Sequence, residues 1–200
     1  MKRILCLFCA CLLTVNLAAC GKKAESSPET TEAGTASEKI QAVITVENYG
    51  EIRVELDRTA APITVDNFVK LAEEGFYDGL TFHRIISGFM IQGGDPTGTG
   101  MGGSKETIRG EFRENGVENP ISHVRGTISM ARSQMMDSAS SQFFIVHEDS
   151  TYLDGAYAGF GQVTEGMEVV DAICKDTQVL VGNGTVAPEN QPVIQSIVIE

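Results

Sequence analysis

Short apolar runs separated by turn residues recur along this chain from residue 40 onward, and they restrict its fold more than any other feature. The runs are rich in valine, isoleucine, phenylalanine and threonine, as β-strands are. Only residues 62–74 and 167–174 carry apolar side chains at helical spacing. Many strands with few helices predict a closed barrel or a sandwich, and closure is favoured because it leaves no long exposed edge. The runs are residues 42–46, 52–56, 127–131, 142–147, 158–163 and 193–199, with two more inside residues 82–95.

Residues 82–95 combine an apolar pattern with two polar residues that a plain core strand would lack. The segment predicts two short strands around a Ser-Gly turn, followed by a Gly-Gly-Asp-Pro loop. Arg84 and Gln92 lie among aromatic and branched neighbours, and the segment holds no obvious acid, base or nucleophile. We therefore expect a site that binds an apolar group and presents a hydrogen-bond donor to it.

The first residues have the pattern of a secretory signal, with Lys2 and Arg3 before an apolar run that is too short for a transmembrane helix. The sequence Leu-Ala-Ala-Cys-Gly that follows resembles the bacterial lipobox, which implies cleavage before Cys20 and lipidation of that residue. Ordinary cleavage with a free Cys20 is the alternative. We predict a signal peptide at residues 1–19, the lipidated Cys20 with a flexible linker at residues 20–39, and one folded domain at residues 40–200.

Charge and cysteine content exclude several classes of protein. The net charge of −12 repels phosphate backbones, so no nucleic-acid partner is expected. Cys6, Cys9 and Cys11 lie in the segment predicted to be removed, and Cys174 is then left without an intrachain partner. The folded domain is therefore expected to contain no disulfide and to depend on a packed core.

No pattern in the sequence predicts a cofactor or a metal. Residues 98–103 match G-x-G-x-x-G, but a proline precedes them and no helical period follows, so the pattern favours a mobile glycine-rich loop over a dinucleotide site. His83, His123 and His147 are too scattered to form a ligand set by their spacing. Each is interpreted as a structural or surface histidine.

Five segments together resemble the cyclophilins, the barrel-type peptidyl-prolyl cis/trans isomerases. The resemblance covers about residues 40–200, with the segments in the same order. It implies a mainly β fold, a closed eight-stranded antiparallel β-barrel capped by two α-helices, and no cofactor. The segments are FHRIISGFMIQGGDP, GTISMA, SQFFI, YLDGAYAGFGQV and EGMEVVDAI.

The resemblance also implies a set of site residues. Arg84 matches the catalytic arginine and Gln92 the glutamine that positions it. Three positions depart from the usual family pattern: Arg132 stands in place of Asn, Tyr152 in place of Trp, and Tyr157 in place of a substrate-contacting His. The implied catalytic residues are Arg84, Phe89, Gln92 and Phe144, and the implied substrate-binding residues are Met90, Ala131, Arg132, Gln142, Tyr152, Leu153 and Tyr157.

The expected function is that of an extracytoplasmic isomerase, anchored to the membrane of a bacterial cell envelope through Cys20 and acting on X-Pro bonds of newly exported proteins. Proline-containing polypeptides are the expected partners, and a monomer is expected. Tyr152 is expected to weaken cyclosporin binding. A weakly catalytic or non-catalytic proline-peptide-binding chaperone module, favoured by Tyr157, and a purely structural surface lipoprotein are the alternatives.

Overall fold

The computed structural model of the protein describes residues 39–180 and 182–200. The predicted signal peptide, Cys20 and almost all of the predicted linker lie outside the described residues. Lys39, assigned to the linker from sequence, is the first residue of the first strand. No helix within the described part of the chain is long and apolar enough to cross a membrane.

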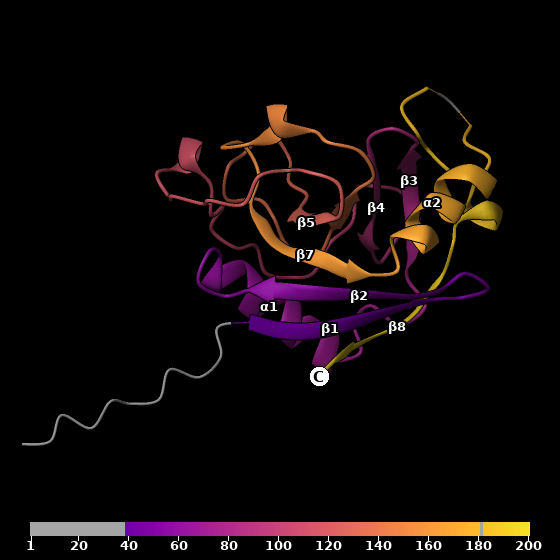
Figure 1. The fold of residues 1–200 in the computed structure, drawn as a ribbon, viewed down its shortest axis with the longest axis horizontal. Coiled ribbons are helices and arrows are strands. Elements are labelled where there is room, and N and C mark those ends of the chain that lie inside the picture. The colour runs from indigo at the N-terminus through magenta and orange to yellow at the C-terminus, as the bar shows by residue number, and fades with distance from the viewer. Residues whose placement is uncertain (1–38, 181) are drawn as a thin grey trace, which may run out of the picture. The chain divides into compact units, whose positions relative to one another are not determined.

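The folded unit is a single antiparallel sheet of eight strands with two α-helices, as the sequence predicts (Figure 1). The strand order is β3-β4-β6-β5-β7-β2-β1-β8, so the hairpins β1–β2 and β3–β4 lie far apart along the sheet. The strands are β1 (Lys39–Val46), β2 (Gly50–Asp57), β3 (Thr81–Ile86), β4 (Met90–Asp95), β5 (Thr127–Met130), β6 (Phe143–Val146), β7 (Gly159–Glu165) and β8 (Ile194–Ile199), and the helices are α1 (Pro62–Glu73) and α2 (Met167–Asp176).

Closure of the sheet is less complete than the sequence led us to expect. The two edge strands, β3 and β8, meet only through an isolated bridge between Thr81 and Val193. Three backbone hydrogen bonds lie beside it, from Phe82 to Pro192 at 2.9 Å, from Ile194 to Leu80 at 2.7 Å and from Gly79 to Ile194 at 2.8 Å. The edges therefore pair at one end only, and the sheet forms a partly closed barrel instead of a fully laddered one.

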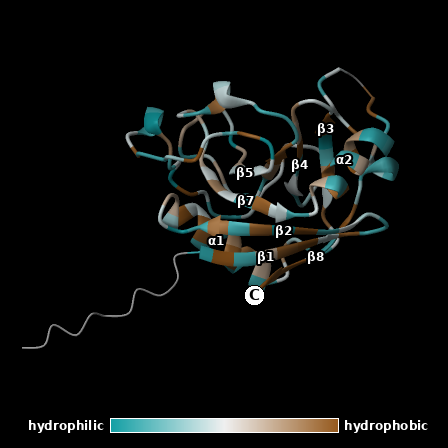
Figure 2. Ribbon diagram, in the orientation of Figure 1, coloured by the Kyte–Doolittle hydropathy of each residue, from teal (hydrophilic) through white to brown (hydrophobic). Residues whose placement is uncertain are grey.

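The first hairpin follows directly from its sequence. Ile52, Val54 and Leu56 alternate with polar residues along β2 and are fully buried, which is the period of a strand with one face on the core (Figure 2). Asn48 has φ 64°, a left-handed conformation that asparagine tolerates better than most residues. The turn at Asn48 and the alternating burial along β2 favour the same strand pairing, so the register of β1 against β2 is fixed locally.

Helix α1 covers the core through one apolar face. Pro62 occupies the first turn, and the Glu111 carboxylate accepts hydrogen bonds from the backbone N–H groups of Ile63 at 3.1 Å and Thr64 at 2.8 Å. Gly75, with φ 67°, follows the last turn, as predicted. Phe68 is fully buried and contacts three aromatic rings at centroid distances of 5.2–5.4 Å, those of Tyr77, Phe143 and Phe160.

The loop at residues 98–103 is attached to the sheet through Asp95. The Asp95 carboxylate accepts backbone hydrogen bonds from Thr99 at 3.1 Å, Gly100 at 2.6 Å and Gly102 at 3.1 Å. Burial acts to raise the pKa of Asp95, but these bonds and those of Thr97 outweigh it, and the pKa lies below its ordinary value. The predicted loop is present and no helix follows it. These anchoring bonds argue against the predicted mobility, and because Asp95 occupies the N–H groups, they are not available to a nucleotide phosphate.

Candidate active site

The β3–β4 hairpin places Arg84 and Gln92 directly opposite each other. The Nη1 atom of Arg84 donates to the Oε1 atom of Gln92 at 3.3 Å, and its Nε atom donates to the backbone carbonyl of Asn183 at 2.8 Å. Burial lowers the pKa of the guanidinium, but arginine titrates so far above neutrality that the group stays cationic. The structure thus brings the two predicted polar residues together and fixes the plane of the guanidinium with two acceptors.

A second glutamine continues this polar chain. The Nε2 atom of Gln92 donates to the Oε1 atom of Gln142 at 2.8 Å. The Nε2 atom of Gln142 in turn donates to the backbone carbonyls of Gly102 at 2.7 Å and Gly100 at 3.2 Å. Both amide groups are therefore oriented by their partners, so the oxygen of Gln92 faces Arg84. The anchored glycine-rich loop is the last member of this chain.

The apolar side of the site is a small cluster that is separate from the main core. Met90, Phe144 and Val146 are its buried members, on β4 and β6, and Phe89 and Leu153 pack against them. The Arg84 guanidinium lies 6.0 Å from the centre of the Phe89 ring. A cavity of about 360 Å³ opens between the cluster and the guanidinium. Nine of the eleven predicted site residues line it: Arg84, Phe89, Met90, Gln92, Ala131, Arg132, Phe144, Leu153 and Tyr157.

The two remaining predicted site residues lie next to the cavity. Gln142 lines an adjoining groove of about 340 Å³, which shares Gln92 and Ala131 with the cavity. Tyr152 is 71% exposed, and its ring lies 5.9 Å from the Phe89 ring. Tyr152 therefore contributes an aromatic surface at the rim but does not line the cavity.

Arg132, although cationic, is occupied by contacts within the protein. Its Nε and Nη2 atoms donate to the Ala156 carbonyl at 2.9 Å and 2.8 Å. The guanidinium lies 4.9 Å from the centres of the Phe112 and Tyr157 rings. Tyr157 also meets Phe144 edge to face at 5.8 Å. Arg132 thus lines the cavity but holds the Tyr157 ring against the apolar wall.

A comparison of the sequence with models of known protein families shows which family the chain is related to. The sequence model of the family described as "Cyclophilin type peptidyl-prolyl cis-trans isomerase/CLD" matches residues 42–199. The chain belongs to the cyclophilin family. Among curated cyclophilin-family relatives, it is 52% identical to peptidyl-prolyl cis-trans isomerase B of Bacillus subtilis over 123 residues, 62% of this chain and 82% of that protein. It is 45% identical to a peptidyl-prolyl cis-trans isomerase of Synechococcus elongatus over 142 residues, 70% and 92% of the two chains.

Solved structures give the same result. A cyclophilin-type peptidyl-prolyl cis-trans isomerase of Cryptosporidium parvum, crystallised in the presence of the dipeptide Ala-Pro, superposes with a TM-score of 0.70 at 32% identity. The match covers 80% of this chain and 98% of that one. The predicted eight-stranded, two-helix fold of a cyclophilin is therefore confirmed.

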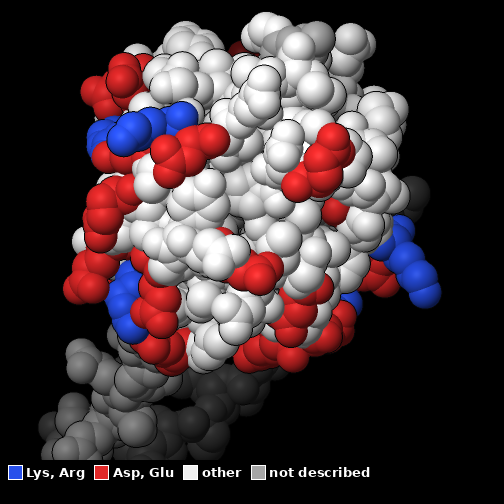
Figure 3. Space-filling model, turned by 90° about the vertical axis from the view of Figure 1, so that its right-hand side faces the viewer, with Lys and Arg blue, Asp and Glu red and all other residues white. Residues whose placement is uncertain are grey.

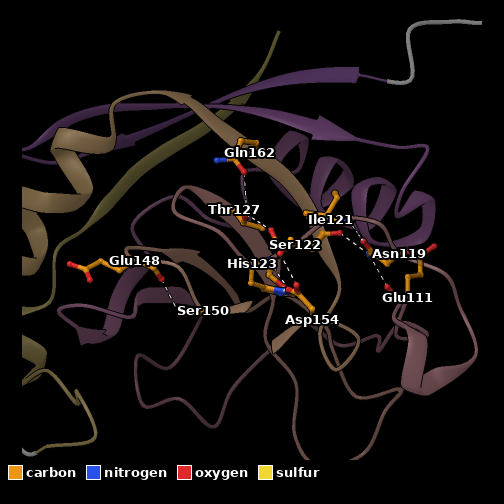
Figure 4. Close-up of polar contacts among 12 residues, drawn as sticks. Glu111, Asn119, Ile121, Ser122, His123, Thr127, Glu148, Ser150, Asp154 and Gln162 are labelled. Carbon is orange, nitrogen blue, oxygen red and sulfur yellow. Dashed lines mark hydrogen bonds and ion pairs between the residues drawn. The ribbon is translucent and has the colours of Figure 1, made fainter. Parts of the chain in front are cut away.

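A buried polar network surrounds His123 in this cyclophilin (Figure 4). It lies next to the apolar wall, because the His123 ring stacks on the Phe144 ring at a centroid distance of 6.0 Å. The His123 ring is bonded through Nδ1 to Asp154 and through Nε2 to Ser129, both at 2.9 Å. Asp154 also accepts hydrogen bonds from the Ser122 hydroxyl at 2.6 Å and the His123 backbone at 2.7 Å. Burial lowers the pKa of His123, and Asp154 only partly opposes it. The structural role predicted for His123 is confirmed, and the network fixes the turn that carries Leu153.

Sequence reasoning missed five residues that line the cavity. Asn183 and Thr185 belong to the loop between α2 and β8, outside every segment that carries the family resemblance. The Asn-Gly pair at residues 183–184 was the only signal, and it indicates a turn without indicating its position in space. His83, Thr99 and Gly100 complete the set.

Side chains that commonly bind metal ions do not form a cluster in the part of the chain that the structure describes. Within residues 39–180 and 182–200, no group of three or more His, Cys, Asp or Glu side chains could hold a metal ion. His83 lies in a β-bulge next to Arg84, and burial lowers its pKa. Neither of its ring nitrogens has a hydrogen-bond partner within the described part of the chain.

Proposed function

We propose that this chain is a peptidyl-prolyl cis/trans isomerase that seats the proline ring of an X-Pro bond in the cavity and uses Arg84 to stabilise the twisted transition state. The observation that carries the proposal is the position of Arg84. Its guanidinium is held by Gln92 and Asn183 at the edge of a cavity that the apolar cluster also lines. Among the described residues, Nη2 has no acceptor, so its N–H groups are available to a substrate.

The barrier to be lowered comes from amide resonance and amounts to about 18–20 kcal/mol. When the X-Pro bond twists, the proline nitrogen loses conjugation and gains a lone pair. A donor directed at that nitrogen forms its bond only in the transition state, and such an interaction accelerates the step instead of merely strengthening binding. A guanidinium suits this role because it stays charged and because its planar fork can be fixed at one edge while another N–H faces the substrate.

The apolar wall supplies the complementary half of the mechanism. The proline ring is apolar, so the surface formed by Phe89, Met90, Phe144 and Leu153 can hold it by excluding water. While the proline ring is held, rotation about the X-Pro bond moves the residue before proline. The Tyr157 ring is kept in place by Arg132 and Phe144, and it lines the cavity.

The family relationship supports the same reaction. The curated relatives at 45–52% identity are named peptidyl-prolyl cis-trans isomerases. The crystallised relative was studied with a dipeptide that ends in proline. Proline-containing polypeptides are accordingly the substrates proposed for this chain. We propose that it acts as a monomer and that exposed Tyr152 leaves cyclosporin binding weak.

Replacement of Arg84 tests the mechanism directly. Arg84→Ala should lower kcat/KM for an Ala-Pro tetrapeptide about 100- to 1,000-fold in a coupled isomerisation assay, which is the typical effect of removing one transition-state donor. The matched control is Arg58→Ala, which removes an exposed arginine that is paired with Asp66 and is not among the cavity-lining residues. Arg58→Ala should keep wild-type turnover. Near-normal turnover of Arg84→Ala, with the fold intact by circular dichroism, would contradict the mechanism.

The cellular setting is a separate part of the proposal. The lipobox resemblance around Cys20 supports a bacterial lipoprotein that is tethered outside the cytoplasm and assists the folding of exported proteins. One visible face of the folded unit carries many more acidic than basic residues, as expected for a soluble, negatively charged domain (Figure 3). Metabolic labelling with a palmitate analogue should mark the wild type but not Cys20→Ser. Labelling of both proteins, or of neither, would refute the anchor without affecting the proposed reaction.

A further inference from the structure

His147 contacts the turn between β3 and β4 through two different groups. Its backbone N–H donates to the carbonyl of Phe89 at 2.8 Å, which extends the β4–β6 ladder by one step. Its ring Nδ1 atom accepts a hydrogen bond from the backbone N–H of Gly88, also at 2.8 Å. The two peptide units that flank the Gly88–Phe89 pair, Ser87–Gly88 and Phe89–Met90, are therefore both held by a single residue, which the sequence suggested was only structural or at the surface.

The other side of the ring faces helix α2. The Nε2 atom of His147 lies 3.1 Å from the Asp171 carboxylate, and Arg125 bonds both the same carboxylate at 2.8 Å and the His147 carbonyl at 2.7 Å. Because Nδ1 accepts from Gly88, the proton of the neutral ring is on Nε2, which lies at ion-pair distance from the Asp171 Oδ1 atom without forming a hydrogen bond to it. The His147 side chain is only 12% exposed, so its orientation is well constrained.

The turn that His147 holds carries a wall of the cavity. Phe89 lines the cavity, and the Arg84 guanidinium lies 6.0 Å from the centre of its ring. Gly88 has φ 81°, a left-handed conformation, and its neighbour Phe89 bonds back to Ile86 at 2.9 Å. A shift of the Gly88 peptide would therefore move the Phe89 ring relative to both the proline ring and Arg84.

We propose that His147 is a positioning residue for the isomerisation reaction, acting through its Nδ1 bond to Gly88 to set the Phe89 wall beneath Arg84; this inference rests on the proposed function. It acts only while Nδ1 is unprotonated. When the ring gains a second proton, Nδ1 becomes a donor, the Gly88 N–H loses its acceptor, and the Phe89 turn is released. Acidification should therefore lower turnover through His147.

The groups around the ring are consistent with such a response. Asp171 on α2 and Arg125 before β5 face it directly, while Asp149 in the next turn accepts a bond from the Arg125 backbone at 2.8 Å. The acidic side chain of Glu148 follows in the chain. His83 and His123 are the other histidines of the described part of the chain, and burial lowers the pKa of each.

Two amide variants of the full chain separate the two sides of the ring. In His147→Asn, the side-chain oxygen can take the place of Nδ1 and accept from Gly88, but contact with Asp171 is lost. In His147→Gln, the longer amide can reach Asp171, but the acceptor for Gly88 is lost. The readouts are kcat and KM for one Ala-Pro tetrapeptide, measured by protease-free NMR exchange between pH 5 and 8, and the melting temperature of each variant.

The proposal predicts that His147→Gln loses at least about threefold in kcat, the effect of one lost hydrogen bond, with little change in KM. His147→Asn should stay within about twofold of wild type at pH 8 and should lose the acid limb of the wild-type profile. A purely structural link to α2 predicts the reverse order. Equal kcat values for both variants, or an unchanged acid limb in His147→Asn, would overturn the inference, whereas an inactive wild type would overturn the proposed function itself.

Discussion

The Nε atom of Arg84 and the backbone carbonyl of Asn183 form a 2.8 Å hydrogen bond that joins residues 99 positions apart in the sequence. The surrounding backbone makes the contact rigid, since Ile85 donates to the Gly184 carbonyl at 2.8 Å and Val186 donates to the His83 carbonyl at 3.0 Å. The loop between α2 and β8 thus acts as a short extra strand beside β3. The Asn183 carbonyl in this loop therefore sets the orientation of the Arg84 guanidinium from the side opposite Gln92.

Gly184 makes this relationship testable. It has φ 84°, and a Cβ atom there would lie 2.5 Å from the Ile85 carbonyl oxygen. Gly184→Ala should therefore push the loop away from β3, weaken the Asn183–Arg84 bond, and lower kcat about tenfold or more. Gly182→Ala is the matched control, because a Cβ atom there meets no atom of the described residues within 4 Å. Steady-state isomerisation kinetics would measure both variants, and equal kcat values would contradict the role of the loop.

Tyr157→His tests which function the site performs. Tyr157 packs against Phe144 and Arg132, and in the proposed mechanism Arg84 supplies the donor. We therefore expect kcat/KM of Tyr157→His to lie within about threefold of wild type, a change typical of one altered contact. A gain of about a hundredfold in the same tetrapeptide assay would instead indicate a proline-peptide-binding module whose turnover the tyrosine suppresses.

Asp95→Asn should loosen the glycine-rich loop in a pH-dependent way. The folded-state pKa of Asp95 is depressed, so its contribution to stability is present above the unfolded-state pKa of about 3.9 and is lost as the pH falls through the lower folded-state value. The wild type should therefore be more stable than Asp95→Asn at pH 7, and the difference should shrink in acid. Urea denaturation at several pH values measures it. Asp176→Asn, at an exposed position on α2, is the control.

Phe68→Ala should destabilise the protein strongly. The ring is fully buried and contacts three other aromatic rings, so its removal leaves a cavity that the core cannot fill. We expect a loss of about 3–5 kcal/mol in the free energy of unfolding. Ile63→Ala, on the same helix but 43% exposed, should cost much less. Comparable losses in urea denaturation would show that α1 does not pack as described.

Local patterns predicted much of this structure because they depend on neighbouring residues. Alternation in β2, Pro62 at the start of α1 and the Ser-Gly turn of the β3–β4 hairpin each depend on a few adjacent positions. The pairing of Arg84 with Gln92 follows from that hairpin once its turn is placed. The incomplete closure between β3 and β8 was not predictable in this way, because it depends on how far the sheet curls.

Sequence alone determined the elements, the family and nine of the residues that line the cavity, since short-range geometry and family motifs specify them. Tertiary structure decided what those residues contact. The Asn183 carbonyl reaches Arg84, His147 holds the Gly88 turn, and Arg132 is occupied by Ala156 and two aromatic rings. The physical reason is that backbone carbonyls and ring nitrogens have no signature in a sequence: their partners are set by which distant segments the curled sheet brings within hydrogen-bonding distance.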